Sequence, residues 1–118
     1  MLNLSDGPTV FLACGSTDLR MSIDGLAALV TYRFQLDLFS NSLFVFCNRD
    51  RDKLKILYWD HNGFWLYYRR LDRGHFKWPA HSGDQTRAVS RRQLQWLLDG
   101  LTLEQRQAHS PVMARIAV

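Results

Sequence analysis

The side chains best suited to binding chemistry in this chain are basic residues in its middle part. Residues 49–92 hold eleven basic and five acidic side chains, although the net charge of the 118-residue chain is only +4. Twelve of the fifteen basic residues are arginines, whose planar guanidinium groups suit bidentate contact with phosphate. Solvated surface charge is the competing interpretation. The pattern predicts a groove along a nucleic-acid backbone, formed by Arg49, Arg51, Lys53, Lys55, Arg69, Arg70, Arg73 and Lys77 and joined by Arg91 and Arg92 at a helix start.

Aromatic side chains occur in the same part of the chain. On a surface, aromatic rings beside arginine suit stacking on nucleic-acid bases or anchoring a protein partner. In strands, however, such rings also form cross-strand pairs or belong to the core. The sequence leaves both interpretations open, and the candidate partner-binding residues are Tyr58, Trp65, Tyr67 and Trp78.

Groups for acid–base or metal chemistry are few, and their spacing fits no known ligand pattern such as HExxH. The sequence also has no phosphate-binding loop, dinucleotide fingerprint or GxSxG motif. We therefore expect no catalytic site, no metal and no cofactor. The only candidates for such roles would be Asp18, Asp24, Asp60, His61, His75 and His81.

Composition indicates a folded protein, because 47% of the residues are hydrophobic and only 22% are charged. Cys14 and Cys47 each lie in an apolar run, which is typical of buried free thiols in a reducing compartment. We find no signal peptide and no apolar run long enough to span a membrane. The expected location is the cytoplasm, with no membrane partner.

Strand-forming runs are expected at residues 9–14, 43–47, 54–59 and 64–71, with weaker ones at 76–78 and 87–89. Asn62-Gly63 between two of these runs predicts a hairpin. Alternation would place on one of its faces Lys55, Leu57, Trp59, Phe64, Leu66, Tyr68 and Arg70. The other face would hold Leu54, Ile56, Tyr58, Asp60, Trp65, Tyr67, Arg69 and Leu71.

Two amphipathic helices are expected. The first would begin at Ser22 and carry an apolar stripe formed by Ile23, Leu26, Ala27, Val30 and Phe34. The second would begin with a capping box of Ser90 and Gln93, end at Gly100 and carry a stripe formed by Leu94, Leu97, Leu98 and Leu101. We predict an α+β fold, a mainly antiparallel sheet of four to five strands with two flanking helices. Residues 1–103 would form a single domain, and residues 104–118 a loosely ordered tail.

Two stretches near the start of the sequence match a known family motif. They are Gly15-Ser16-Thr17-Asp18-Leu19-Arg20 and Asp24-Gly25-Leu26-Ala27-Ala28-Leu29-Val30. They resemble the opening of the TnpB-type accessory proteins of the insertion-sequence-sixty-six transposon family. The resemblance extends over residues 8–101. It departs from the usual pattern at Met21-Ser22 and after Leu101. Further matches in order are Lys55-Ile56-Leu57-Tyr58-Trp59-Asp60, Arg73-Gly74, Trp78-Pro79 and Leu97-Leu98-Asp99-Gly100.

The resemblance implies a protein encoded beside a DDE-type transposase and needed for efficient transposition, without agreed catalytic residues. We therefore expect a non-catalytic accessory factor that binds this transposase, transposon-end DNA, or both, through an Arg-rich, aromatic hairpin face. The alternative is a pure protein–protein adaptor for the transposase that makes no direct contact with DNA.

Overall fold

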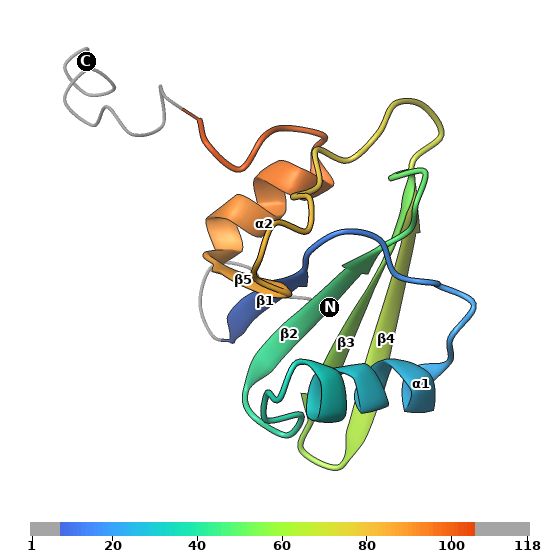
Figure 1. Cartoon of the computed structure of the whole chain (residues 1–118), viewed down its shortest axis with the longest axis vertical. Helices are drawn as coiled ribbons and strands as arrows, with labels where there is room; N and C mark the ends of the chain where they lie inside the picture. Colours follow the sequence, from blue (N-terminus) through green and yellow to red (C-terminus); the bar gives the residue numbers. More distant parts are fainter. Residues whose placement is uncertain (1–7, 106–118) are drawn as a thin grey trace, which may run out of the picture.

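The computed structural model describes residues 8–105, which form a five-stranded sheet with a helix on each face (Figure 1). The strand order is β4-β3-β2-β1-β5; β1 and β2 run parallel, and every other neighbouring pair is antiparallel. The predicted α+β class with a mainly antiparallel sheet is confirmed. In chain order the elements are β1 (Thr9–Ala13), α1 (Ile23–Ala28), the π-helical turn η1 (Leu29–Arg33), β2 (Ser42–Cys47), β3 (Lys53–Asp60), β4 (Gly63–Arg70), β5 (Thr86–Val89) and α2 (Arg91–Leu98).

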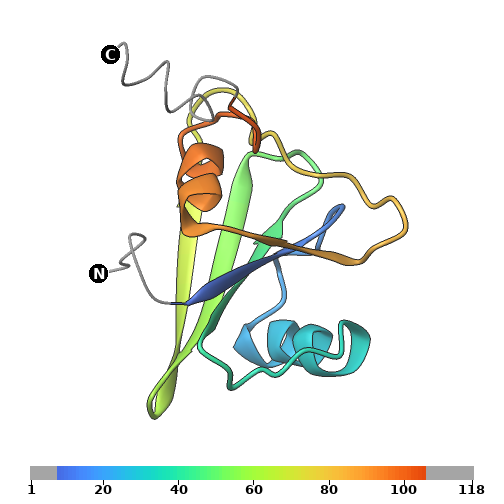
Figure 2. The same cartoon turned by 90° about the vertical axis from the view of Figure 1, so that its left-hand side faces the viewer.

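The central strand β2 is buried on both faces, and all six of its residues are inaccessible to solvent. Alternation sends Phe44 and Phe46 toward α1, and Val45 and Cys47 toward α2. Figure 2, seen from the side, shows the two helices on opposite faces of the sheet. The continuous apolar run of β2 is thus explained by two separate layers of cover.

The layer on the first face consists of α1 and η1. Leu26 and Val30 are fully buried there against the sheet. The predicted continuous α-helix instead changes to a π-helical turn, in which the Phe34 amide donates to the carbonyl of Leu29 at 2.9 Å. A π-turn takes up an extra residue, so side chains five positions apart come to face the same way. Leu29 and Phe34 accordingly pack against the same core cluster.

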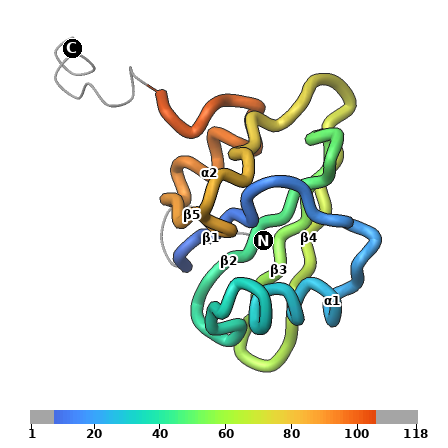
Figure 3. Tube along the Cα trace, in the orientation of Figure 1, coloured from blue at the N-terminus to red at the C-terminus, as the bar shows by residue number. Residues whose placement is uncertain are grey.

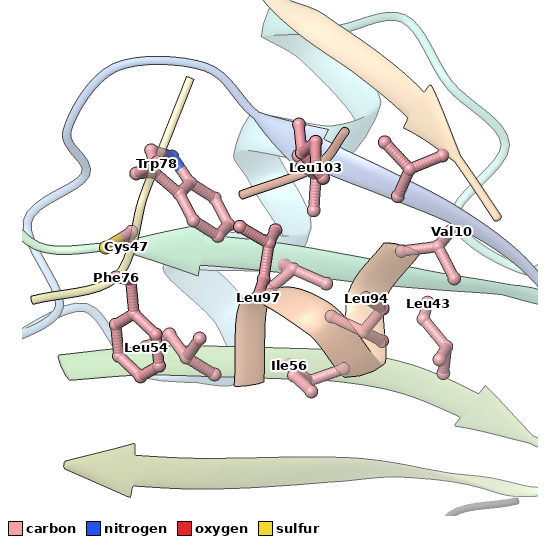
Figure 4. Close-up of a cluster of buried hydrophobic side chains, with 13 residues drawn as sticks. Val10, Leu43, Cys47, Leu54, Ile56, Phe76, Trp78, Leu94, Leu97 and Leu103 are labelled. Carbon is pink, nitrogen blue, oxygen red and sulfur yellow. The ribbon is translucent and has the colours of Figure 1, made fainter. Parts of the chain in front are cut away.

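The layer on the second face consists of α2, whose Leu94 and Leu97 are fully buried against side chains of β1, β2 and β3 (Figure 4). The predicted capping box is present: Ser90 Oγ accepts from the Gln93 amide, and the Gln93 side chain accepts from the Ser90 amide. The helix ends at Leu98, three residues before Leu101, the last residue of the predicted apolar stripe. As a result, Leu101 is 44% exposed rather than buried.

The hairpin of β3 and β4 has the predicted alternation. Asp60 pairs with Gly63, and every partner pair up to Lys53 and Arg70 follows the two expected faces. The turn itself contains His61 and Asn62, and its left-handed residue is His61, with φ of 60°. Gly63 therefore belongs to the strand instead of the turn.

The weaker strand predictions had different outcomes. Residues 87–89 fall within β5, whereas residues 76–78 form no strand. In this loop Phe76 and Trp78 are buried against the α2 layer, which explains why the segment is as apolar as a strand (Figure 4).

The core extends to Leu103, which is 7% exposed and packs in the α2 layer. Of the predicted tail, residues 104–118, the part from residue 106 onward lies outside the described residues. Within residues 8–105, no helix has both the length and the apolar composition needed to cross a bilayer.

The two helix starts give a matched test of capping. Ser90→Ala removes a side-chain hydrogen bond to the helix start, and we expect it to lower the free energy of unfolding by about 1 kcal/mol. Ser22 occupies the same position in α1 but makes no capping hydrogen bond with its side chain, so Ser22→Ala should cost much less. Urea denaturation measures both values. Equal losses in the two variants would contradict this account.

Candidate nucleic-acid interface

The predicted basic residues surround one end of the β3–β4 hairpin, the end away from its tight turn. Lys53 lies directly across the ladder from Arg70, with Lys55 two positions further along β3. Arg69 precedes Arg70 in β4. The others are in the adjoining loops: Arg49 and Arg51 between β2 and β3, and Arg73 and Lys77 after β4. We call these eight residues the basic end. Arg91 and Arg92, which the sequence grouped with them, are instead the first residues of α2, whose opposite end lies beside Arg69 and Arg73.

Backbone hydrogen bonds join the two loops of the basic end. The Leu71 amide donates to the Asp52 carbonyl at 2.8 Å, and the Phe76 amide donates to the Arg51 carbonyl at 2.7 Å. Figure 3 shows the two loops side by side. Their cationic side chains are therefore held at one place by backbone contacts that do not use the charges.

The turn between β2 and β3 is ordered by Asn48. Its Oδ1 accepts from the amides of Asp52 and Lys53, both at 3.0 Å, and its amide group donates to the Asp52 carboxylate at 2.7 Å. This last bond holds the pKa of Asp52 below its usual value. Arg51 has a φ of 59° within this turn. The side chain of Asn48 thus fixes the conformation that presents Arg49 and Arg51.

The basic end covers both faces of the hairpin, whereas the sequence suggested a single Arg-rich face. Strand alternation puts Lys53, Lys55 and Arg70 on the α1 side and Arg69 on the α2 side. On the α2 side a hollow of about 520 Å³ is lined by Arg69, Arg73 and Lys77 together with the end of α2. The positive charge therefore forms a rim around the end of the hairpin.

On the α1 side the basic end borders a larger cleft. Its volume is about 900 Å³, and one wall is the loop between β1 and α1. We call it the loop cleft; its lining residues are Ser16, Thr17, Asp18, Leu19, Arg20, Asn48, Arg49, Asp50, Lys53, Lys55 and Tyr68. Residue patterns alone did not predict that this loop would lie beside the hairpin.

The wall of the loop cleft begins at a point of tight packing. Gly15 has a φ of 75°, and a Cβ atom there would lie 3.1 Å from the Cβ of His81, so glycine is required. The amide of Gly15 donates to the Pro79 carbonyl at 2.9 Å, and that of Thr17 donates to the Cys47 carbonyl at 2.8 Å. These bonds tie the loop to two other segments.

Lys55 ties the same loop to the hairpin. Its Nζ donates to the carbonyl oxygens of Leu19, at 2.6 Å, and of Met21, at 3.3 Å. The ammonium group is partly buried by these contacts. Lys55 therefore supports the wall of the loop cleft and contributes charge to its floor, a role that its place in a strand did not reveal.

Asp18, one of the two acidic residues that line the cleft, is paired. Arg20 donates through Nε and a terminal nitrogen to the Asp18 carboxylate, with a shortest distance of 2.8 Å. This contact lowers the pKa of Asp18 to about 2. Asp18, which the sequence offered as a possible catalytic or metal-binding group, is instead engaged with Arg20. Arg20 adds a ninth cation to this region that the sequence did not single out.

The candidate partner-binding aromatics differ in exposure. Trp65 is 53% exposed on the α2 side of the hairpin, and its ring stacks on Tyr67 with centroids 6.1 Å apart. Its indole N–H donates to Asp60 at 3.1 Å. Tyr67 is partly buried, as is Tyr58, whose hydroxyl donates to Asn41. Trp65 is therefore the member of this group most open to a partner.

Trp78 does not lie on this surface. Only 8% of it is exposed, and its indole N–H donates to the carbonyl oxygen of Ala13 at 2.9 Å. Figure 4 shows the ring within the α2 layer. The sequence suggested Trp78 as a partner-binding residue, but it is buried in one cluster with Phe76 and Leu97.

Three exposed aromatic side chains were not predicted as site residues. Tyr68 is 56% exposed and lines the loop cleft. Phe39 is 60% exposed and makes edge contacts with Trp59, at a centroid distance of 4.9 Å, near the turn of the hairpin. Tyr32 projects from η1. The face shared by Tyr68 and Lys55 was visible in the strand pattern, whereas the position of Phe39 depends on a loop.

The cysteines and the possible catalytic groups form no metal-binding cluster in the described part of the chain. Both Cys14 and Cys47 are free, and burial raises the pKa of Cys47 to about 12. Within residues 8–105, no three His, Cys, Asp or Glu side chains are close enough together to hold a metal ion.

Comparison with known proteins identifies relatives over most of the chain. The family model described as "IS66 Orf2 like protein" matches residues 8–108. The chain is 38% identical to the uncharacterized protein y4hO of Sinorhizobium fredii (strain NBRC 101917 / NGR234) over 101 residues, covering 86% of this chain and 87% of that protein. It is 33% identical to y4jC of the same strain over 79 residues, or 67% and 68% of the two chains. No solved structure matches it significantly.

The Asp18–Arg20 contact predicts a measurable titration. The carboxylate is favoured in the folded chain, so the stabilisation it provides is present above the ordinary pKa and is lost as the pH falls through the folded value. Carbon-detected NMR should give a midpoint of about 2 for Asp18. Arg20→Gln should return it toward 3.8, while Arg49→Gln should leave it unchanged. A wild-type midpoint near 3.8 would show that the pair does not form in solution.

Proposed function

Since this chain belongs to the IS66 Orf2-like family of transposition-associated accessory proteins, we propose that it holds transposon-end DNA for a DDE-type transposase and catalyses no reaction itself. Phosphate groups of the DNA backbone would contact the basic end. Such contacts position a protein on DNA without reading its sequence, so we expect little preference among sequences.

The observation that supports this proposal is the gathering of cations at one end of the hairpin. Eight basic side chains from two strands and two loops surround the end, and Arg20 lies beside them. Two of the acidic neighbours are already paired, Asp18 with Arg20 and Asp52 with Asn48 and Lys53. The field that remains attracts a phosphate backbone, and neutralising several phosphates releases counterions.

The transposase would occupy a different part of the hairpin. Trp65, stacked on Tyr67, lies on the α2 side of β4, which is an edge strand of the sheet. A large, half-exposed aromatic side chain at an edge is a common anchor for a protein partner. Tyr58, directly across the ladder from Trp65, would form the base of this contact. The two ends of one hairpin would then connect DNA to the enzyme.

Charge reversal tests the DNA contact. We expect the triple variant Arg69→Glu, Arg70→Glu and Arg73→Glu to lose most of its affinity for duplex DNA at low salt. The salt dependence of binding should fall by about one unit of slope for each lost phosphate contact. Fluorescence anisotropy with a terminal-repeat duplex and a scrambled duplex measures both.

A double variant, Arg87→Glu and Arg92→Glu, is the control because both residues are exposed outside the basic end. Circular dichroism should show that each variant is folded. If the folded triple variant binds duplex DNA as tightly as the wild type does, the proposed DNA contact is wrong.

The exposed Trp65 also favours a second candidate function, a protein–protein adaptor for the transposase that makes no contact with DNA. In that case the chain should co-purify with the transposase after nuclease treatment, and Trp65→Ala should abolish co-purification. Tyr68→Ala is a matched control, since Tyr68 is equally exposed on the opposite face of the same strand. Retained co-purification by the Trp65 variant would exclude this surface as the anchor.

A further inference from the structure

We propose that the loop cleft binds unpaired DNA, with one base stacked on Tyr68 and the neighbouring phosphates held by the cations around it. This inference rests on the proposed function and makes it more specific, because it names the form of DNA that the α1 side of the basic end accepts. Duplex backbone would contact the rest of the rim.

The first support is the placement of Tyr68 among cations. Its ring is 56% exposed and lines the loop cleft. Directly across the ladder is Lys55, and the next pair on the same face is Lys53 with Arg70. Residues two apart in a strand lie roughly 7 Å from each other, so Arg70 is next to the ring along β4, while Lys55 is beside it across the ladder. An aromatic ring with flanking cations in a groove is the usual platform for single-stranded nucleic acid.

The second support is that hydrogen bonds within the chain hold the wall of the cleft in place. Its outer wall is tied down by the amides of Gly15 and Thr17 and by the ammonium group of Lys55. The Asp18 carboxylate, which would repel a phosphate, is bound by Arg20. A preformed site avoids the entropic cost of ordering the loop on binding.

The third support is the size of the cleft. A volume of about 900 Å³ falls in the range of small-molecule sites, roughly 300–1,000 Å³, and suits one or a few nucleotides. In a duplex the faces of the bases are covered by their neighbours in the stack, so Tyr68 has no base face to contact. Unpaired bases offer that face, whatever their sequence.

Trp65 gives a matched comparison within the same strand. Its exposure is nearly the same as that of Tyr68, but it lies on the opposite face. Its ring already stacks on Tyr67, and its indole N–H is bonded to the carboxylate of Asp60, which disfavours a nearby phosphate. If the loss of any exposed aromatic side chain weakens DNA binding, Tyr68→Ala and Trp65→Ala should both weaken it. If stacking at Tyr68 is specific, only Tyr68→Ala should do so.

The test uses the full chain and two labelled probes, a 12-nucleotide oligothymidine strand and a blunt duplex of the same length, at one fixed salt concentration. We expect the wild type to bind the single strand more tightly than the duplex. Tyr68→Ala should weaken single-strand binding roughly 5- to 150-fold, the effect of losing one stacked base, and should leave duplex binding nearly unchanged. Tyr68→Phe, which keeps the ring, and Trp65→Ala should both retain single-strand affinity.

Three results would overturn the inference. These are a single strand bound no more tightly than the duplex, a Tyr68→Ala variant that binds the single strand normally, and an equal loss on both probes. In each case the proposed function would still be supported if the wild type binds the duplex and the Arg69, Arg70 and Arg73 triple variant does not. If the wild type binds neither the single strand nor the duplex, both this inference and the proposed function are wrong.

Discussion

The fold depends on burying β2 on both of its faces. A strand with six inaccessible residues needs a cover on each side of the sheet, and this chain supplies two short helices, of six residues in α1 and eight in α2. The two helices lie on opposite faces of the sheet (Figure 2). The eight-residue strands β3 and β4 extend beyond this cover. Their ends are therefore free to carry charges and aromatic rings at little cost to the core.

Features that depend on local patterns were predictable from the sequence. Alternation along the hairpin assigned each side chain to its face, and the register agrees from Lys53 to Asp60. The spacing of Ser90 and Gln93 predicted the capping box because both hydrogen bonds form within one helical turn. The apolar run of β2 predicted a central strand. Each of these features is set by neighbours in the chain, so no knowledge of distant contacts was needed.

Features that depend on distant contacts were not predictable. Trp78 is in the core because a loop brings it to Ala13, 65 positions away in the chain. The loop cleft exists because Lys55 reaches the carbonyl of Leu19, and no local pattern in either segment indicates this contact. Basic residues next to each other in sequence, such as Arg69 and Arg70, were grouped as one surface although a strand must separate them. Strand alternation thus divided the basic residues of the hairpin between two faces, but the positions of those in the adjoining loops required the structure.

The pairing of β1 with β5 brings together strands from opposite ends of the described chain, with Val10 beside Val89. Contacts within β2, β3 and β4 join near neighbours and close short loops, whereas this pairing closes almost the whole chain. During synthesis β1 leaves the ribosome first, yet its last partner strand and the helix that covers Val10 and Leu12 leave nearly last. Until then β1 has an open edge and an uncovered apolar face. The order of synthesis therefore means that β1 gains its second partner strand only after β2, β3 and β4 have been made.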